Sequence, residues 1–405
     1  MNPKLRDLDI RPIEHEGRVL LLLRDPLLLA GSQIGVPREL APLLALMDGT
    51  RDESALEAAL LIRAGVKLAP GLLAQLLADL DEVFLLENDR FANALAQARQ
   101  VFRDLPCRPM TTLDGTSLSA QSEKARAWLQ SYVDGLAEAE EREDRALIRG
   151  LVCPHIDYHR GGPVYAEVWR AVADAARQAE RVIILGTDHQ GSDCALTLTR
   201  QSYCTPWGVL PTDQEVVAAL ADALGEEAVF GEELHHRGEH SIELAAAWLH
   251  FFREGQPVPM APILCGHFQG LLEGSLDPAE YEPFSMAVDA LRPAMESRRT
   301  LVVAAADLAH MGPAFGDAYG LDAITKAQLR GADERLLEAI CAGDAADFFG
   351  QLREVGNRRH VCGLPPIYLA LRLLGETWGE PAGYDQCPAD AEGLSFVSVA
   401  GAVLY

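Results

Sequence analysis

Positive charge is scarce in this sequence. Among its 405 residues, 35 Lys and Arg stand against 60 Asp and Glu, which gives a net charge of -25. A chain with this balance repels phosphate backbones and anionic lipid over most of its surface. The composition therefore argues against nucleic acid and against a membrane as partners.

Long hydrophobic runs are missing near the start of the chain. The first ten residues, MNPKLRDLDI, alternate charged and apolar side chains, which is unlike a signal peptide. The leucine-rich stretch at residues 19–29 is interrupted by Arg24, Asp25 and Pro26, so it does not read as a membrane span. We expect a cytoplasmic protein.

Closely spaced cysteines are absent as well. The chain has no C-x-x-C pair, which argues against a disulfide framework and against a closed zinc knuckle. Most cysteines are expected to be small buried side chains, so a functional one must be identified from its neighbours. The eight cysteines lie at positions 107, 153, 194, 204, 265, 341, 362 and 387.

The chain does contain enough apolar residues, 49%, for two cores. One hydrophobic core usually stops growing at about 250–300 residues, so two domains are expected. We place a small domain at residues 1–95, a linker with the first helix of the next domain at 96–149, and an α/β domain at 150–405. Residues 122–146 are expected to form an exposed, charge-rich helix.

The small domain has the pattern of three helices and a wing. Pro37 and Pro70 suit the starts of the first and third helices, and residues 50–53 read as a capping box for the second. Residues 83–91 could fold as a small hairpin. This order predicts a winged-helix-like unit.

The segments LMDGTRD and LLAQLLADLDEVFLL in this domain resemble PqqD-like peptide-recognition domains of radical SAM systems. No Lys or Arg occurs at residues 68–87, whereas Asp79, Asp81 and Glu82 do. A DNA-reading third helix would need positive charge there. We therefore expect the domain to dock a peptide or a radical SAM protein, with a purely structural appendage as the alternative.

The sequence of the larger domain repeats a pattern that predicts a strand, a loop and a helix in turn. Runs of Val, Ile and Leu alternate with amphipathic helices, which predicts a mostly parallel central sheet with helices on both faces. The runs are ALIRGLVC, RVIILG, APILCG, TLVVAAAD and LSFVSVAGAVLY.

Polar residues follow three of these runs. His155 comes after the first run and His189 after the second, whereas Asp307 ends the fourth and His310 follows it by three residues. The functional crevice of an open α/β sheet lies beyond the carboxyl ends of its strands, so these residues can converge. Cys362 precedes a helix opened by two prolines, and a thiol near a helix N-terminus is more readily a thiolate. Each residue alone would also suit a structural role.

Seven segments occur in the order in which Memo-family proteins carry their signatures, a family that includes the "AmmeMemoRadiSam system protein B" group. The resemblance covers residues 108–405 and implies a fold similar to the class III extradiol dioxygenases. The segments are PHIDYHRGGPVYAEVW, ILGTDHQG, TPWGVLPTD, EHSIELAAAWLHF, APILCG, ADLAHMG and VCGLPPIYLALRLL.

The resemblance assigns roles residue by residue. It implies a metal held by His155, His189 and Cys362. Asp307, His310 and His240 line the same pocket, where they are expected to orient ligands or move protons. Fe(II) is the expected metal, with Cu and Zn as alternatives that the same donors suit.

Substrate contacts are expected from Arg160, which suits an anionic group, and from Tyr158, although Arg160 would equally suit the surface. The chain departs from the family at residues 112–118, where many members have an aromatic segment. His235 and His236 are expected to be solvated loop residues, with a loop that covers the pocket as the alternative, and Ser241 is expected to be a helix N-cap.

These expectations favour a non-haem Fe(II)-dependent oxidoreductase, dioxygenase-like, that acts on a small-molecule or peptide substrate together with a radical SAM system. A non-catalytic metal- or ligand-binding adaptor is the alternative. A metal-dependent hydrolase is a weaker one. Fold and ligands do not by themselves establish turnover.

Overall fold

The computed structural model describes residues 2–111, 122–137, 147–274 and 276–405. The chain divides into two compact units, Met1–Asp104 and Leu105–Tyr405. In the described ranges no helix combines the length and the apolar character that a membrane crossing needs. The segment 112–118 and part of the charge-rich helix expected at 122–146 lie outside the described residues.

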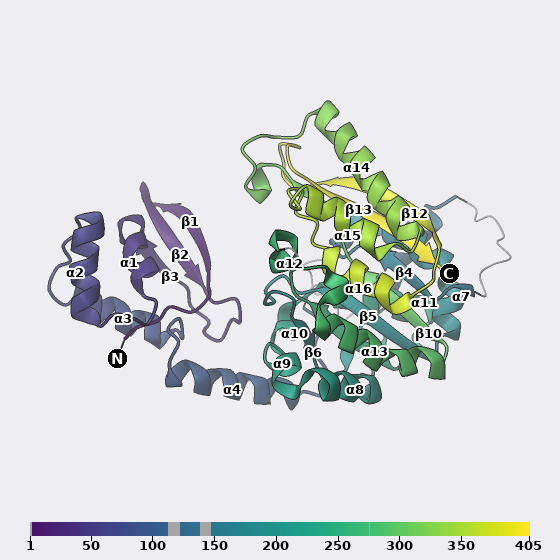
Figure 1. Ribbon diagram of the computed structural model, residues 1–405, viewed down its shortest axis with the longest axis horizontal. Helices are drawn as coiled ribbons and strands as arrows, with labels where there is room; N and C mark the ends of the chain where they lie inside the picture. The colour runs from purple at the N-terminus through teal and green to yellow at the C-terminus, as the bar shows by residue number, and fades with distance from the viewer. Residues whose placement is uncertain (1, 112–121, 138–146, 275) are drawn as a thin grey trace. The chain divides into compact units, whose positions relative to one another are not determined.

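A three-stranded antiparallel sheet opens the first unit, in the order β1-β2-β3 (Figure 1). The β1–β2 turn places Glu16 and Gly17 at positive φ, 50° and 72°, as a tight hairpin requires. Leu23 and Val36 point into the small core. The strands are β1 (Asp9–His15), β2 (Arg18–Arg24) and β3 (Ile34–Pro37).

Helices follow this sheet, and the predicted hairpin at residues 83–91 is wrong. Asn88 instead caps α4 by accepting a hydrogen bond from the amide of Phe91. The cap of α2 is Asp52, not Thr50, because the Asp52 carboxylate accepts from the amide of Ala55. The helices are α1 (Ala41–Leu46), α2 (Glu53–Ala64), α3 (Leu72–Glu82) and α4 (Asp89–Arg103).

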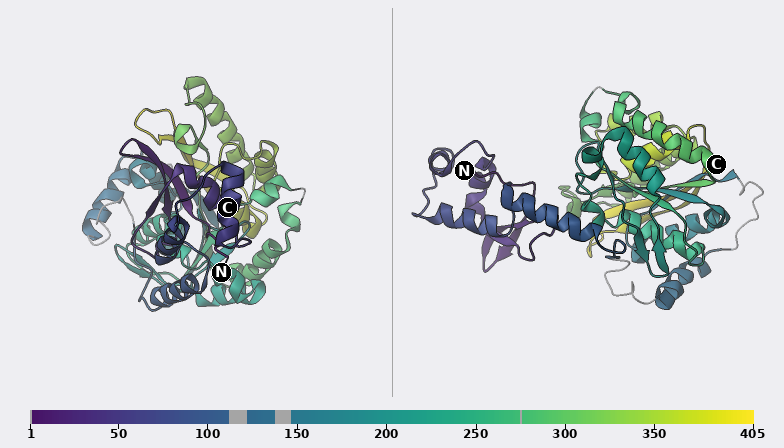
Figure 2. Two further views of the ribbon diagram at one scale, coloured as in Figure 1. Left: turned by 90° about the vertical axis from the view of Figure 1, so that its left-hand side faces the viewer. Right: turned by 90° about the horizontal axis from the view of Figure 1, so that it is seen from below.

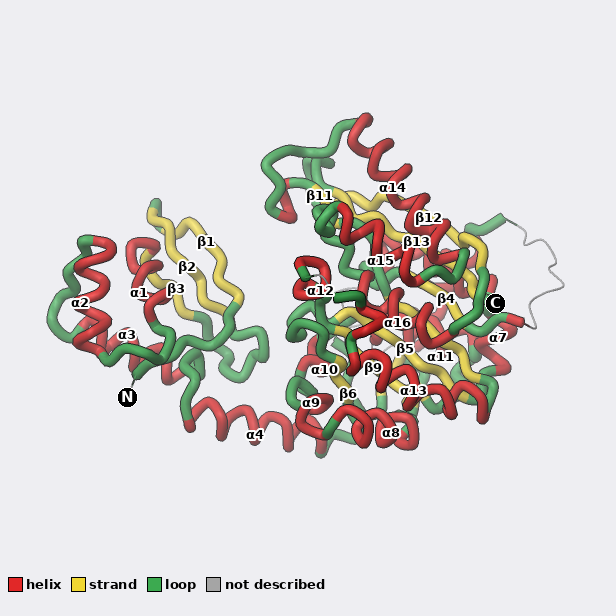
Figure 3. Tube along the Cα trace, in the orientation of Figure 1, coloured by secondary structure: helices red, strands yellow, loops and turns green. Residues whose placement is uncertain are grey.

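An eight-stranded sheet, whose strands are yellow in Figure 3, forms the centre of the second unit. Its strand order is β11-β13-β4-β10-β5-β9-β6, and β12 pairs with β13. The four middle strands, β4, β10, β5 and β9, are parallel, as predicted, and antiparallel strands flank them. The strands are β4 (Gly150–Cys153), β5 (Arg181–Thr187), β6 (Leu196–Leu198), β9 (Met260–Cys265), β10 (Thr300–Ala305), β11 (His310–Met311), β12 (Gly379–Pro388) and β13 (Phe396–Leu404); β7 (Tyr203–Thr205) and β8 (Gly208–Leu210) form a separate hairpin.

Helices cover both faces of this sheet, as predicted (Figure 2). Helices α6 and α11 pack on one face, and α8, α13 and α16 on the other. The bounds are α5 (Ser122–Asp134), α6 (Tyr158–Ala171), α7 (Ala173–Gln178), α8 (Gln214–Leu224), α9 (Glu226–Phe230), α10 (His235–Gly238), α11 (Ser241–Phe252), α12 (Gln269–Glu273), α13 (Glu282–Ser297), α14 (Ala323–Cys341), α15 (Ala345–Glu354) and α16 (Leu364–Leu374).

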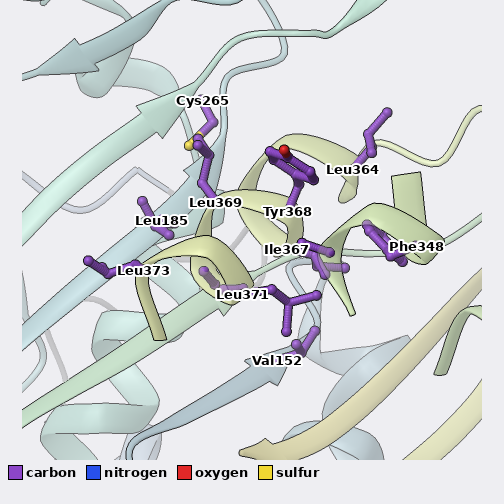
Figure 4. Packing of buried hydrophobic residues seen from close by; sticks show 14 of the residues in the cluster. Val152, Leu185, Cys265, Phe348, Leu364, Ile367, Tyr368, Leu369, Leu371 and Leu373 are labelled. Atoms are coloured by element: carbon purple, nitrogen blue, oxygen red, sulfur yellow. The ribbon is translucent and has the colours of Figure 1, made fainter. Parts of the chain in front are cut away.

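Helix α16 is central to the packing because its apolar side chains reach four strands. Ile367 and Leu371 lie near Val152 of β4, and Leu369 lies near Cys265 of β9 (Figure 4). All of these side chains are at most 4% exposed. This packing fixes the start of α16, and with it the loop that carries Cys362.

Five of the six unpaired cysteines fit the expectation of buried or half-buried side chains outside the site. One pairing was not predicted: Cys107 and Cys204 form a disulfide, 97 residues apart. The bond joins the segment after α4 to β7. The wide spacing of the cysteines in the sequence argues against a framework of several disulfides. It does not indicate whether two distant cysteines form a single disulfide.

Candidate metal centre

Three neighbouring parallel strands each place one polar residue two positions beyond the strand end. His155 follows β4, Asp307 follows β10 and His189 follows β5, and these strands lie side by side in the order β4-β10-β5. The carboxyl ends of parallel strands meet at one sheet edge. The predicted convergence of these three residues is therefore present.

Cys362 reaches the same edge from the loop before α16. Its Sγ lies 3.3 Å from Nε2 of His155, and one donor atom each of His155, His189 and Cys362 lie within 4.8 Å of one another. Gly363 lets this loop approach, because a Cβ there would lie 2.4 Å from the carbonyl oxygen of Asp307. Gly363, next to Cys362, is a signal for this close approach that the sequence contains.

Both histidines present the same ring nitrogen to the thiol. Nδ1 of His155 lies 3.0 Å from the carbonyl oxygen of Ala305, and Nδ1 of His189 lies 2.9 Å from a carboxylate oxygen of Glu239. Carbonyl and carboxylate oxygens only accept, so each Nδ1 carries the proton. Each Nε2 is left for a metal, which is the usual arrangement of ligand histidines.

Asp307 organises the loop of His155. One carboxylate oxygen accepts from the amides of His155 and Ile156, at 2.8 and 3.2 Å. The other lies 3.6 Å from Nε2 of His155, and the Asp307 side chain is 2% exposed. Asp307 therefore combines a structural role with negative charge beside the candidate ligands.

Electrostatics make Cys362 a thiolate. Burial would raise the pKa of this thiol, but the positive charges of His155 and His310 lower it to about 5. Burial lowers the pKa of His155, but Asp307 and Cys362 raise it to about 9. Without a metal, the site at neutral pH therefore holds a thiolate beside a protonated imidazole.

His240 and His310, predicted to move protons, both line the site. The ring of His240 is stacked on that of His189, with centroids 5.2 Å apart, and burial lowers the pKa of His240 to about 4. It is therefore neutral at pH 7. His310 is half-buried, and its ring meets the edge of Phe315 at 5.1 Å.

A cavity of about 660 Å³ opens beside these groups, with His155 and His189 in its wall. Arg160 lines it too, but its Nε lies 2.6 Å from the carboxylate of Asp157, so part of its charge is already compensated. The remaining lining residues are Ile156, Asp157, His240, Leu244, Asp307, His310, Ala314, Phe315, Ala389 and Val397.

Tyr158 lies behind this cavity and not in its lining. Its side chain is fully buried, its hydroxyl donates to the carbonyl of Leu244 at 2.6 Å, and its ring packs edge-on against Tyr165 and Trp248. Leu244 does line the cavity. Tyr158 thus supports the wall through Leu244.

Two expectations on neighbouring residues were wrong. His236 is not solvated: it is fully buried between the hydroxyl of Tyr203, at 2.6 Å, and the carbonyl of Thr197, at 2.9 Å. Ser241 does not cap α11 but begins it, and its hydroxyl donates to the carbonyl of Thr187 at 2.9 Å. Periodicity alone could not distinguish these bonds from solvent contacts.

Glu239 was not singled out from the sequence, although it adjoins His240. Within the described residues it forms a second donor group with His189 and His240, and Asp188, Glu232 and His235 form a third. In these two groups the histidines already use Nδ1 to contact a carboxylate of the same group. Nδ1 of His235, for example, lies 2.9 Å from a carboxylate oxygen of Asp188. The group of His155, His189 and Cys362 fits a metal best, because its free Nε2 atoms meet a thiolate.

Fold and donor atoms together define an α/β protein with a candidate divalent-metal centre at the carboxyl edge of its sheet. The family model described as "Memo-like protein" matches residues 108–403. The chain therefore belongs to the Memo family.

Relatives of this family extend over different parts of the chain. A "MEMO1 family protein" of Aquifex aeolicus is 26% identical over 417 residues, covering 100% of both chains. One from Thermus thermophilus is 28% identical and covers 84% of this chain and 95% of its own length. One from Methanosarcina acetivorans, 28% identical, covers 60% and 78%. The match to the Aquifex protein thus includes the first unit.

Proposed function

We propose that this protein is a non-haem, Fe(II)-dependent oxidoreductase of the dioxygenase-like kind. The convergence of two Nε2 atoms and one thiolate beside a cavity of about 660 Å³ carries the proposal. Three protein ligands leave coordination positions open, whereas a structural zinc site usually has four. Bound iron would supply redox chemistry, and Cu or Zn would suit the same donors.

Two histidines supply proton transfer in this proposal. His240 is neutral because burial lowers its pKa to about 4, so its imidazole can accept a hydrogen bond from the substrate proton that is to be transferred. His310 lies next to Phe315 in the cavity wall. Asp307 holds the loop of His155 and adds negative charge.

The substrate in this proposal is a small molecule or a peptide side chain. Part of the cavity wall is apolar, and Arg160 adds one cationic side chain to it. The apolar lining residues are Ile156, Leu244, Phe315 and Val397. Arg160 shares its charge with Asp157. A substrate with an apolar body and a polar reacting group would suit this lining.

The first unit is the docking site for a peptide or a radical SAM protein in this proposal. Within the described residues β1 is an edge strand, since it pairs with β2 alone. An edge strand offers backbone groups to an added strand, a mode that tolerates an acidic surface. The same separate unit is the feature that favours the alternative of a non-catalytic adaptor.

Oxygen consumption tests the function. The protein would be purified without oxygen, loaded with Fe(II), and mixed with candidate substrates and with a radical SAM partner in an oxygen electrode. Substrate-dependent uptake is expected, and His310→Ala should retain the metal but lose most of the uptake. The matched control is His267→Ala, an exposed histidine paired with Asp193 outside the cavity. Tight metal binding without uptake under any condition would favour the adaptor.

A further inference from the structure

Glu239 joins two elements of the site through its two carboxylate oxygens. One oxygen accepts from the amides of His240 and Ser241, at 2.8 and 3.0 Å, at the start of α11. The other accepts from the amide of His189 at 3.2 Å and from its Nδ1 at 2.9 Å. The Glu239 side chain is 7% exposed. The first oxygen also lies 3.2 Å from Nδ1 of His240, so it has three partners and the second oxygen has two.

The second oxygen decides which nitrogen of His189 can bind a metal. Because a carboxylate oxygen only accepts, Nδ1 must carry the proton and Nε2 holds the lone pair. The tautomer of His155 is set by a main-chain carbonyl, that of Ala305. Of the two candidate ligand histidines, His189 is therefore the one whose tautomer depends on a side chain.

Glu239 is itself held in place by buried contacts. Arg108 donates to the carbonyl oxygens of Glu239 and His236, at 2.7 Å each, and pairs with the buried Glu243. Gly186, in β5, lets α11 approach, since a Cβ there would lie 2.6 Å from the Ser241 hydroxyl oxygen. The carboxylate and the His189 loop therefore form one packed unit.

We propose that Glu239 is a positioning residue that holds His189 in its Nδ1-protonated tautomer and presents Nε2 to a divalent transition metal. The inference rests on the proposed metal centre and assigns this centre a residue that is not a ligand. Outer carboxylates of this kind typically change metal affinity 10- to 100-fold.

The variant Glu239→Gln tests the second carboxylate oxygen of Glu239 separately from the first, because it replaces only one of the two oxygens by an NH2 group. The amide oxygen of Gln can still accept from His240 and Ser241, whereas its NH2 group cannot accept from Nδ1 of His189. With Co(II) as the probe, we expect affinity to fall 10- to 100-fold, while the metal-free protein unfolds near the wild-type temperature. Glu239→Asp, which keeps an acceptor-only carboxylate, should recover part of the affinity.

Two comparisons keep the test specific. Glu233→Gln changes another buried glutamate, which accepts from Thr199 at 2.9 Å, and should bind Co(II) like the wild type. In a His189→Ala background, Glu239→Gln should cost no further affinity, because the two residues act as one unit. The Co(II) spectrum should keep its thiolate charge-transfer band in Glu239→Gln.

The outcomes distinguish this inference from the function on which it rests. Wild-type affinity in folded Glu239→Gln would overturn the inference alone. A further tenfold loss in the His189→Ala background would make Glu239 a ligand or a fold determinant, and would also overturn it. Absence of Co(II) binding in the wild type would overturn the metal centre and the inference together.

Discussion

Arg108 and Glu243 form an ion pair in which both side chains are fully buried. Arg108 lies where the match to the Memo family begins, and Glu243 lies in the first turn of α11. The amide and hydroxyl of Thr111 also donate to the Glu243 carboxylate, at 2.9 and 3.0 Å. The pair joins the segment after the first unit to the helix next to the candidate metal centre.

Removing one partner should therefore destabilise the protein strongly. Arg108→Met leaves the Glu243 carboxylate buried without its cation, which typically costs about 3–5 kcal/mol. The double variant Arg108→Met/Glu243→Met should recover part of this loss. Thermal unfolding of the wild type, both single variants and the double variant measures the coupling. Additive losses would show that the two charges do not depend on each other.

Metal content is the direct check on the three candidate ligands. We expect the wild type to bind one transition-metal ion per chain. The occupancy should fall strongly in each of three variants, His155→Ala, His189→Ala and Cys362→Ser, because an open site has no spare protein ligand. Cys341→Ser, which changes another half-buried cysteine, is the control. Elemental analysis of anaerobically purified protein gives the occupancy. Full occupancy in the triple variant would contradict the assignment.

Metal affinity should rise with pH over a defined range. The Cys362 thiol has a pKa of about 5, so above that pH the protons to be displaced are those of His155, whose pKa is about 9, and of His189, whose pKa the Glu239 carboxylate raises. Affinity should increase about tenfold per pH unit for each proton released, between about pH 6 and 9, and then level off. Competition titrations with a chelator measure it. A flat profile would show that the imidazoles are neutral without metal.

A second pH effect concerns stability and arises from a buried carboxyl that is not among the candidate ligands. Asp333 in α14 is fully buried and accepts from the hydroxyl of Tyr384 at 2.9 Å, and burial raises its pKa to about 6. The folded protein then holds this proton more tightly than the unfolded chain, so stability falls as pH rises from about 4 to 6. Asp333→Asn should be more stable than the wild type at pH 7.5, by at most about 3 kcal/mol, and equal near pH 4. Asp289→Asn, at an exposed site, is the control.

Binding by the first unit should depend on its sheet and not on charge. Helix α3, Leu72–Glu82, contains no Lys or Arg, so duplex DNA should bind weakly or not at all at physiological ionic strength. A radical SAM partner or its peptide should bind the full chain but not a chain without residues 1–104. Titration of both chains against both ligands separates these cases. Salt-sensitive DNA binding with no protein binding would contradict the charge argument.

The central strands and the convergence of His155, His189 and Asp307 could be predicted because both depend on local patterns. Apolar runs define buried strands, and topology brings their ends together. The sheet at residues 9–37 could not be predicted from the helical pattern that follows it. Leu20 to Leu23 form a continuous apolar run, and only pairing with β1 and β3 assigns it to a sheet.

Residues that act through side-chain hydrogen bonds over long sequence distances could not be identified in this way. Glu239 lies among polar residues in the sequence, and Arg108 is an isolated charged residue; a charged side chain normally indicates contact with solvent. Their burial follows from partners that lie far away along the chain, such as His189 and Glu243. Cys107 and Cys204 give no local signal either.

The position of β13 in the sheet has a consequence for biosynthesis. This strand follows all other strands of the sheet in sequence, yet it pairs with β4, the first of them, with Ala402 opposite Val152. Ser398 of β13 also bonds both backbone groups of Ala309, beside His310. A ribosome synthesises both candidate ligand histidines long before this strand. Until β13 has been made, β4 has an unpaired apolar edge, so the nascent chain should bind chaperones and complete the candidate metal centre only once β13 is in place.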